Sequence, residues 1–195
     1  KPMWYANETK NEVVNNPGQA KRFFDGKTAA PDFFGGFNTA FGYKGFTLNA
    51  DFMYSYGNYN IDARARGLVS DGRLTPRSTA VIAFEKRWVP GKTDAVWPQH
   101  RWGGQPGSNE QFNSRWLFDG SFIRLKNVTL AYSFPESMVQ SMSLSSLRLY
   151  VRGTNVLTFV KDKNSYIDPE QSIDGTSDAM TPQAKTFSVG LDIGL

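Results

Sequence analysis

The sequence of 195 residues contains no cysteine and one histidine, His100. Disulfide bonds and thiolate metal sites are therefore excluded, although a chain without cysteine is compatible with any compartment. The sequence also lacks an apolar run long enough for a membrane-spanning helix. The first residues, KPMWYANETK, contain neither an initiator Met nor an apolar signal core. We therefore expect that a leader was removed or that the chain begins inside a longer protein.

Charge of one sign is not concentrated anywhere in the chain. The net charge is +4, from 22 Lys and Arg against 18 Asp and Glu, and the basic residues are scattered singly or in pairs. Nucleic acid is therefore not an expected partner. The sequence has no P-loop, no G-x-S-x-G motif and no HExxH motif, and its one histidine has no evident partner. We expect no catalytic residue, no bound metal and no cofactor, and hence a protein that is not an enzyme.

What the sequence does contain is 18 glycines and 14% aromatic residues, arranged in alternating segments. In residues 46–56 aromatic and aliphatic side chains alternate with polar ones, and residues 33–43 and 186–195 follow the same pattern. A period of two predicts strands with one apolar and one polar side. Because only Lys44 and Gly45 separate the first two segments, these predict a tight β-hairpin.

Two further strands are predicted at residues 120–134 and 146–159. The apolar phase of the first changes midway, which predicts a β-bulge near Lys126 and Asn127. Between the two strands, PESMVQSM at residues 135–142 predicts one or two helical turns. The expected organisation is a loop at 1–32, a hairpin at 33–56, a loop at 57–119 with one short helix near 61–69, strands at 120–159 around the helix at 135–142, a loop at 160–182 and a strand at 183–195.

The connections differ in length in a regular way. Those after the first and third strands are short, whereas those after the second and fourth are long, as in outer-membrane barrels with tight periplasmic turns and extended extracellular loops. The strand at 46–56 spans roughly 33 Å, and a tilt of ~40° shortens this to about 25 Å, close to the apolar band of such barrels. The pattern therefore predicts membrane strands, extracellular long loops and a C-terminus on the periplasmic side.

Aromatic side chains stand at both ends of these strands, as in the girdles of membrane barrels. The polar phase is expected to face the lumen, because a lipid-facing Arg near the midplane costs ~2 to 4 kcal/mol. A soluble sandwich with aromatic strand ends is the alternative. The expected lumen-facing residues are Asn49, Asp51, Arg148 and Arg152. The expected girdle residues are Phe41, Tyr43, Phe46, Tyr54, Tyr56, Tyr132, Phe134 and Phe159.

The longest loop carries residues suited to meeting a ligand. Flat aromatic faces suit sugar rings, and loops at the mouth of a barrel are where a substrate or a lid is met. Direct ligand contact, contact with a lid and simple packing of the loop all stay open for these residues, whereas Trp88, between Arg87 and Pro90, is assigned to packing. The candidates are Trp97, His100, Arg101, Trp102 and Trp116.

The loop at 160–182 is acidic. A calcium site needs six to eight converging oxygens, and the loop lacks the ordered D-x-D-x-D-G run of a dedicated calcium loop. We therefore expect solvated acidic side chains and no metal. The acidic residues are Asp162, Asp168, Glu170, Asp174 and Asp178.

Several motifs together carry a family resemblance. The sequence DGSFIRLKNVTLAYSFP at 119–135 closely resembles the C-terminal barrel signature of SusC/RagA-like TonB-dependent transporters of the Bacteroidetes outer membrane. PDFFGGFNTAFGYKGFTL at 31–48 and RWVPG at 87–91 are similar to that family's hairpin and tryptophan-proline loop. SLRLYVRGTNVLTF at 146–159 and YIDPE at 166–170 are similar to its penultimate strand and its DPE element. The resemblance covers roughly residues 30–195, and Leu195 departs from the usual terminal aromatic residue.

This resemblance implies an all-β fold, with the chain supplying about five C-terminal antiparallel strands of a transmembrane barrel of about 22 strands. It also implies an N-terminal plug that contacts TonB, a SusD-like surface lipoprotein as a lid, and uptake of oligosaccharide or oligopeptide through an outer membrane of lipid and lipopolysaccharide. Five strands cannot close such a barrel, because two open edges would face lipid. We therefore expect the chain to be a part of a longer or split transporter.

Two other functions stay open at this point. One is a soluble β-sandwich that binds carbohydrate through its tryptophan-containing loop. The other is a structural barrel component of a surface or secretion assembly, with the same fold but without solute uptake.

Overall fold

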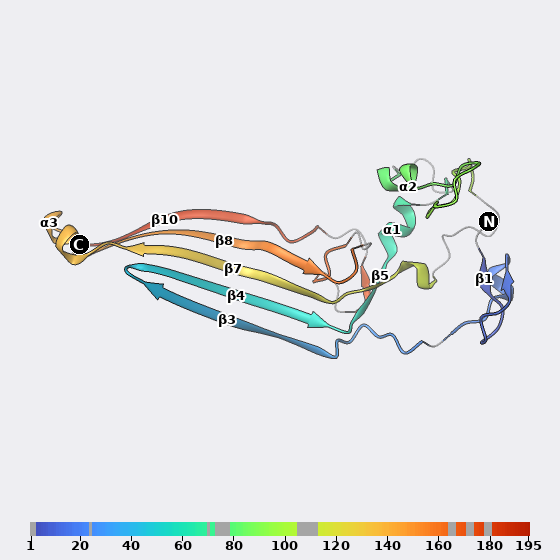
Figure 1. Ribbon diagram of the computed structural model, residues 1–195, viewed down its shortest axis with the longest axis horizontal. Coiled ribbons are helices and arrows are strands. Elements are labelled where there is room, and N and C mark those ends of the chain that lie inside the picture. The colour runs from blue at the N-terminus through green and yellow to red at the C-terminus, as the bar shows by residue number, and fades with distance from the viewer. Residues whose placement is uncertain are drawn as a thin grey trace.

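The structure is a computed structural model that is elongated, with a sheet at one end and the long connections at the other (Figure 1). A five-stranded antiparallel sheet has the order β10-β8-β7-β4-β3. Apart from the edges, each strand therefore lies between its neighbours in the chain, as in an up-and-down barrel wall. The strands are β3 (Phe33–Tyr43), β4 (Phe46–Tyr56), β7 (Phe122–Ser133), β8 (Ser146–Val160) and β10 (Thr186–Gly194), close to the predicted bounds. The residues described are 3–23, 25–69, 71–72, 79–104, 113–163, 167–170, 174–177 and 181–195.

The predicted hairpin of β3 and β4 is confirmed, and its turn explains the choice of residues. Lys44 has φ 45° and Gly45 has φ 87°, so both lie in the left-handed region that a two-residue type I′ turn requires. A side chain at Gly45 would also place its Cβ 2.8 Å from the carbonyl oxygen of Ser133. The turn therefore needs glycine at this position both for its backbone and for its contact with β7.

The predicted β-bulge is also confirmed. The register of β7 against β4 shifts between Leu125 and Asn127, so Lys126 is an extra residue in β7 relative to β4. The register against β8 shifts at the same place, but there the extra residue is in β8, where Asn155 has φ 53°. The bulge restores the alternation, because it lets Leu125 share a face with Val128 although the two differ in phase.

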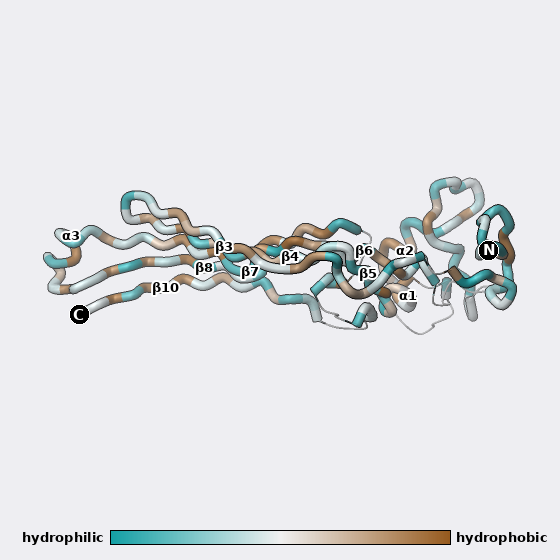
Figure 2. The backbone as a smooth tube through the Cα atoms, turned by 90° about the horizontal axis from the view of Figure 1, so that it is seen from below, coloured by the Kyte–Doolittle hydropathy of each residue, from teal (hydrophilic) through white to brown (hydrophobic). Residues whose placement is uncertain are grey.

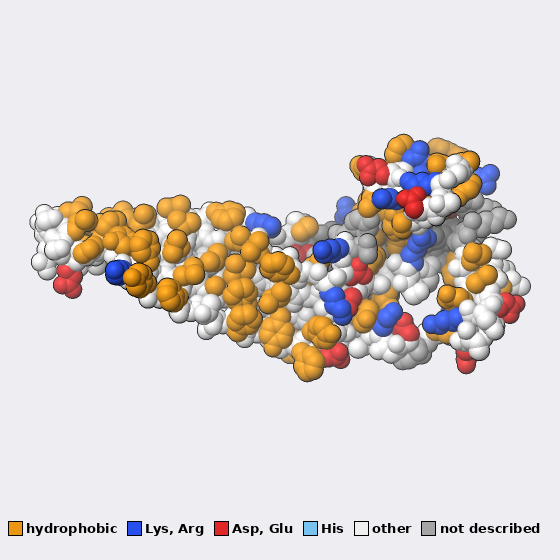
Figure 3. Space-filling view, viewed as in Figure 1, with side chains coloured by type: hydrophobic (Ala, Val, Ile, Leu, Met, Phe, Trp, Pro, Cys, Tyr) orange, Lys and Arg blue, Asp and Glu red, His pale blue; other side chains and the backbone are white. Residues whose placement is uncertain are grey.

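Many apolar side chains cover the face of the sheet seen in Figure 3, and apolar and polar residues alternate along its strands (Figure 2). One face carries large apolar side chains that stay exposed, including Phe187 at 68% and Val189 at 72%. Aromatic rings stack across it, with the centroids of Phe37 and Phe52 4.7 Å apart. Among the residues that the structure describes, no strand of another sheet pairs with this one.

The short helix α3 (Glu136–Ser141) connects β7 and β8, at the same end of the sheet as the hairpin turn and the C-terminus (Figure 1). The predicted helical segment begins at Pro135, whereas in the structure Pro135 is the N-cap residue and the helix begins at Glu136. Among the described residues, no helix has both the length and the apolar character needed to cross a membrane.

The connection between β4 and β7 contains more structure than the single predicted helix. β5 lies between β6 and β9 in a second sheet, and β9 comes from the loop after β8. Ala65, Val69, Ala83, Trp97 and Trp116 form a core of their own beneath this sheet and its helices. The predicted helix near 61–69 is present as α1 (Ala63–Leu68). The other elements are too short to show a period in the sequence, so the prediction missed them. They are β5 (Tyr59–Asp62), α2 (Val81–Glu85), η2 (Ser114–Trp116), β6 (Leu117–Asp119) and β9 (Thr176–Ser177).

The segment before β3 is similarly not a plain loop. β1 (Trp4–Tyr5) and β2 (Val13–Val14) pair as a small antiparallel ribbon, followed by the 3₁₀ turn η1 (Pro17–Gln19). Asn16 caps this turn, since its side-chain oxygen accepts the N–H of Gly18 at 2.9 Å.

Two neighbouring residues of β10 test which face meets lipid. We expect Val189→Glu to lower the free energy of unfolding of the full-length membrane protein by up to about 2 kcal/mol, because its side chain is exposed on the apolar face. Ser188→Glu is the matched control, because Ser188 lies on the polar face opposite Arg152. The midpoint of urea unfolding in lipid vesicles measures both changes. Equal effects of the two substitutions would contradict the assignment of the faces.

Candidate functional site

The four polar residues predicted to face a lumen share one face of the sheet. Asn49 lies opposite Thr129, which lies opposite Arg152. One turn of the pleat further along, Asp51 lies opposite Asn127, whose amide donates to the Asp51 carboxylate at 3.3 Å. Cross-strand bonds of this kind line the polar face, and they fix its side chains relative to the backbone.

Arg148 also lies on this face, near the end that carries α3. Its guanidinium donates to the carboxylate of Asp192 at 3.2 Å, and the two side chains are 40% and 53% exposed. A pair that is this exposed contributes less than about 1 kcal/mol.

The other end of the polar face carries a buried ion cluster that comprises Arg124, Lys126, Asp168 and Glu170. The Arg124 guanidinium donates to Asp168 at 2.5 Å and also to Glu170, while its Nε donates to the Thr158 hydroxyl at 2.9 Å. The Lys126 ammonium donates to Glu170 at 2.7 Å. The exposed fractions are 3% for the Arg124 side chain and 7% for that of Asp168.

The cluster corrects the expectation that the acidic loop is solvated. Asp168 and Glu170 lie against the sheet, because Arg124 and Lys126, two residues apart on β7, place two neighbouring cations there that need anions. Asp162 and Asp174 take part in other interactions, and Asp178 lies outside the described residues. The DPE element at 168–170 contains both acids, but the sequence indicates no contact for them.

Asp168 joins three parts of the chain. Besides the Arg124 guanidinium, it accepts the backbone N–H of Glu170 at 3.1 Å and that of Gln183 at 3.1 Å. Burial alone would raise the pKa of Asp168, but the hydrogen bonds from Arg124 and from the two backbone groups outweigh burial, and the pKa lies below its ordinary value. The carboxylate thus stays ionised, and it holds the loop after β8 to the polar face of the sheet.

The residues predicted to contact a ligand or a lid separate into two groups. Trp116 has no exposed surface, and Trp97 is 9% exposed; their rings stack with centroids 6.0 Å apart. For these two residues, burial favours the packing alternative. Trp102 is 88% exposed, Arg101 is exposed, and His100 is half-buried with no partner for its Nε2 atom among the described residues.

Trp88 differs from its assignment to packing, since its side chain is 45% exposed. Its backbone is nevertheless fixed, because its N–H donates to the Trp97 carbonyl at 2.8 Å. Trp88 thus follows the β-bridge between Arg87 and Trp97, and its ring is partly exposed.

The aromatic residues predicted as girdles gather at the two ends of the apolar face. At the hairpin end, the ring centroids of Phe46 and Tyr132 are 4.6 Å apart and those of Tyr132 and Phe134 are 5.0 Å apart; Phe41 and Tyr43 follow on the neighbouring strand β3. At the other end, Tyr54, Tyr56 and Phe159 line an open hollow of about 380 Å³.

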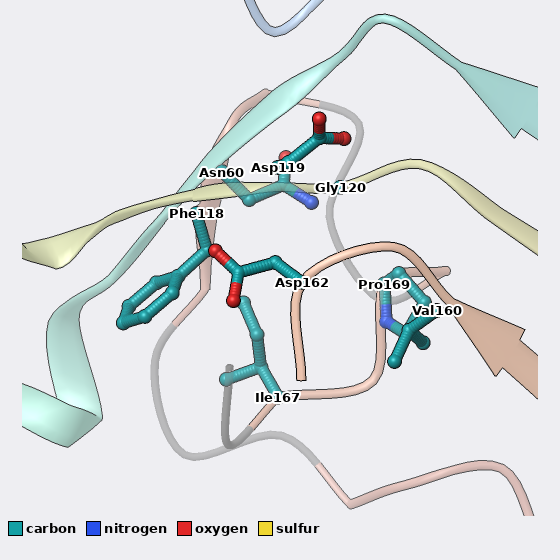
Figure 4. A pocket seen from close by; sticks show the side chains of 8 residues that line it. All are labelled: Asn60, Phe118, Asp119, Gly120, Val160, Asp162, Ile167 and Pro169. Atoms are coloured by element: carbon teal, nitrogen blue, oxygen red, sulfur yellow. The ribbon is translucent and has the colours of Figure 1, made fainter. Parts of the chain in front are cut away.

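One small cavity lies beside the second sheet. A cavity of about 20 Å³ lies between β5, β6 and the loop after β8, where Asn60, Asp162 and Ile167 approach one another (Figure 4). It has room for about one water molecule and not for a nutrient. Among the described residues, no group of three or more His, Cys, Asp or Glu side chains is placed to hold a metal ion.

Removal of one acid tests the ion cluster. We expect Glu170→Gln to weaken the attachment of residues 167–170 by roughly 1–3 kcal/mol, because Lys126 loses its carboxylate while Arg124 keeps only Asp168. Hydrogen exchange of the Gln183 amide, which donates to Asp168, measures the opening of this attachment. Asp192→Asn is the control, since the exposed pair with Arg148 should contribute below about 1 kcal/mol. Unchanged protection of Gln183 in Glu170→Gln would contradict this role.

The attachment should also depend on pH. Because the pKa of Asp168 is lower in the folded chain than its ordinary value of 3.8, the carboxylate stabilises the fold fully above pH ~4, and this contribution is lost as the pH falls through the folded value. Exchange of the Gln183 amide, corrected for its intrinsic pH dependence, should therefore stay constant from pH 7 to pH ~5 and rise only in stronger acid. An increase near neutral pH would contradict this origin.

Comparison with known proteins places these features in a family. No family model matches the chain. The chain is 33% identical to TonB-dependent receptor P3 of Formosa agariphila over 165 residues, which cover 84% of the chain and 15% of that receptor. It is 30% identical to TonB-dependent receptor P26 of the same organism over 84% of the chain and 17% of that receptor. The chain thus spans about a sixth of the length of these relatives.

Solved structures agree with the sequence relatives. The structure of the RagAB peptide transporter matches all of this chain with a TM-score of 0.78 and 26% identity, and the chain covers 21% of it. The RagAB peptide importer in its closed-closed state matches all of the chain with a TM-score of 0.77 and 25% identity. The five-stranded sheet with its two different faces is therefore a segment of a known type of barrel. The chain belongs to the SusC/RagA-like TonB-dependent receptors.

Proposed function

We propose that the chain forms part of the barrel wall of an outer-membrane nutrient importer of SusC type. The observation that carries this proposal is the sheet itself, whose apolar face is exposed while its polar face is bridged by hydrogen bonds and ion pairs. A wall between lipid and a wet lumen needs these two faces. The similarity to TonB-dependent receptors supports the same role.

The orientation follows from the connections. The hairpin turn, α3 and the C-terminus share one end of the sheet (Figure 1), and we propose that this end faces the periplasm. The segments 1–32, 57–119 and 160–182 then reach the extracellular mouth. In this arrangement the ion cluster holds the last of these loops at the rim, and Tyr43, Phe46 and Tyr56 lie in the two aromatic girdles.

The unpaired edges of β3 and β10 point to the remaining barrel. Neither edge has a partner strand among the described residues, and an unpaired strand edge is not tolerated in lipid. The proposed partners are therefore the rest of the barrel, a plug that couples to TonB, a SusD-like surface lipoprotein, and the lipid and lipopolysaccharide around the wall. In this arrangement the chain binds and guides a solute and performs no reaction on it.

The solute is proposed to be an oligopeptide or an oligosaccharide. The structural relatives are named as a peptide transporter and a peptide importer, which supports the first class, while flat aromatic side chains at the mouth suit the second. Trp102 and Arg101 are the exposed members of the predicted contact set and are proposed to meet either the solute or the lid.

Uptake by cells tests the proposal. Cells that carry the full-length protein should accumulate labelled oligopeptides or oligosaccharides only when TonB is present, and cells that lack the protein should not. A protein that is extracted without detergent, or uptake that persists without TonB, would contradict the importer. Isolation of the native barrel without a plug and without a lipoprotein would instead favour a structural assembly.

The mouth residues can be tested in the same cells. We expect Trp102→Ala to weaken binding of the solute or the lid by about 1 kcal/mol or more, because truncating a large aromatic contact often has such an effect. Folding should be unchanged, since the side chain is 88% exposed. Phe84→Ala, which removes a 60% exposed aromatic residue outside the predicted set, is the matched control. Equal uptake and lid affinity in Trp102→Ala and the unsubstituted protein would remove Trp102 from the contact.

A further inference from the structure

Three side chains of β8 form an ordered group on the polar face. The ring of Tyr150 lies between two guanidinium groups, with its centroid 5.8 Å from Cζ of Arg148 and 5.7 Å from Cζ of Arg152. The ring also lies across Gly190 of β10, where a side chain would place its Cβ 2.2 Å from Cζ of Tyr150. The close approach to glycine holds the ring against the sheet, so the position of the flanking Arg152 is constrained as well.

The charges on this face leave Arg152 without an anion. Arg124 and Lys126 have Asp168 and Glu170, and Arg148 has Asp192. Arg152 donates from Nε to the Thr129 hydroxyl at 3.3 Å, and no carboxylate lies within ion-pair distance of it in the part of the chain that the structure describes. The Tyr150 hydroxyl likewise has no hydrogen-bond partner there. The guanidinium of Arg152 and the hydroxyl of Tyr150 thus both have hydrogen-bond donors that are not used within the described residues.

Arg152 lies near the middle of the proposed membrane span. It pairs in register with Ser188 and Thr129, well inside both ends of β8 (Ser146–Val160). Outer-membrane transporters with about 22 strands have a plugged lumen, so a residue at this depth is covered by the plug. A charge that is covered without a counter-charge is strongly unfavourable, and a planar guanidinium matches a carboxylate best.

We propose that Arg152, assisted by the Tyr150 hydroxyl, binds a carboxylate of the plug and so docks the plug against this part of the barrel wall. This inference rests on the proposed function, because it needs a plug in the lumen. It assigns a specific contact to the chain, however, and it can fail while the importer stands.

Cross-linking tests the contact directly. In the full-length protein in membranes, Arg152→Lys places an amine at this position, and a carbodiimide joins an amine to an adjacent carboxylate without adding a spacer. Mass spectrometry should then find residue 152 linked to an Asp or Glu of the plug. Arg148→Lys is the positive control, because it should link to Asp192, the present ion-pair partner of Arg148. A control that links while residue 152 links to nothing, or only to acids of the barrel, would overturn the proposal.

A competing carboxylate sharpens the test. Ser188 lies directly opposite Arg152 on the neighbouring strand, so Ser188→Glu supplies an anion from the wall itself. Combined with Arg152→Lys, it should divert the cross-link from the plug to residue 188. A link to the plug that is unaffected by Ser188→Glu would show that residue 152 reaches the plug without the proposed carboxylate site.

The strength of the docking can be measured on the plug. Arg152→Gln should raise the reaction rate of a cysteine introduced into the plug with a thiol reagent by roughly thirtyfold or more, as expected for loss of one member of a buried charge pair. Tyr150→Phe should raise it less, and Arg148→Gln should leave it nearly unchanged. Equal rates in Arg152→Gln and Arg148→Gln would overturn the proposal.

The solute is the other possible source of a carboxylate. If acidic solute fills the site, the cross-link from Arg152→Lys should appear only when that solute is present and should join residue 152 to the solute, which would overturn docking of the plug. Failure of the importer itself would have a different signature, since TonB-dependent uptake would then be absent from the unsubstituted protein.

Discussion

One extra residue in β7, relative to β4, determines which side chains of β7 lie on the apolar face of the sheet. Without the bulge at Lys126, the half of β7 nearest the long connections would turn Ile123 and Leu125 to the polar side and Arg124 to the apolar side. An Arg in contact with lipid is unfavourable, by up to ~1 kcal/mol near the membrane interface and by more toward the midplane. The bulge therefore keeps one face apolar along the strands and places the charged side chains of β7 on the other face.

Lys126, the bulge residue, also contacts the loop after β8 through its ion pair with Glu170. Because Lys126 lies two residues after Arg124 on the same strand, two positive charges stand together at the end of the sheet, and Asp168 and Glu170 neutralise them. Asp168 also accepts the N–H of Gln183, which lies shortly before β10. A local change in strand register is thus linked to the course of the chain between its last two sheet strands and, in the proposed barrel, to the shape of the mouth.

The sequence predicted the sheet well because its information is local and periodic. The hairpin, the bulge and the five strands follow from alternation and from Lys44 and Gly45. It failed for Asp168 and Glu170, since nothing in an acidic loop indicates a partner on β7 that is more than 40 residues away. It failed also for the strands β5 and β6, which are too short for a period, and it gave no reason to separate the buried Trp116 from the exposed Trp102.

The chain has two sources of stability, and they are separate. The large buried side chains, such as Trp116 and Val69, belong to the compact unit in the loops, which has a core of its own. The sheet has no comparable core, since its apolar residues point outward and its two edges are unpaired among the described residues. In the proposed barrel, lipid on one face and neighbouring strands at the edges stabilise these strands. The loop unit has its own packed core, whereas the sheet in that barrel is stabilised as part of a closed wall.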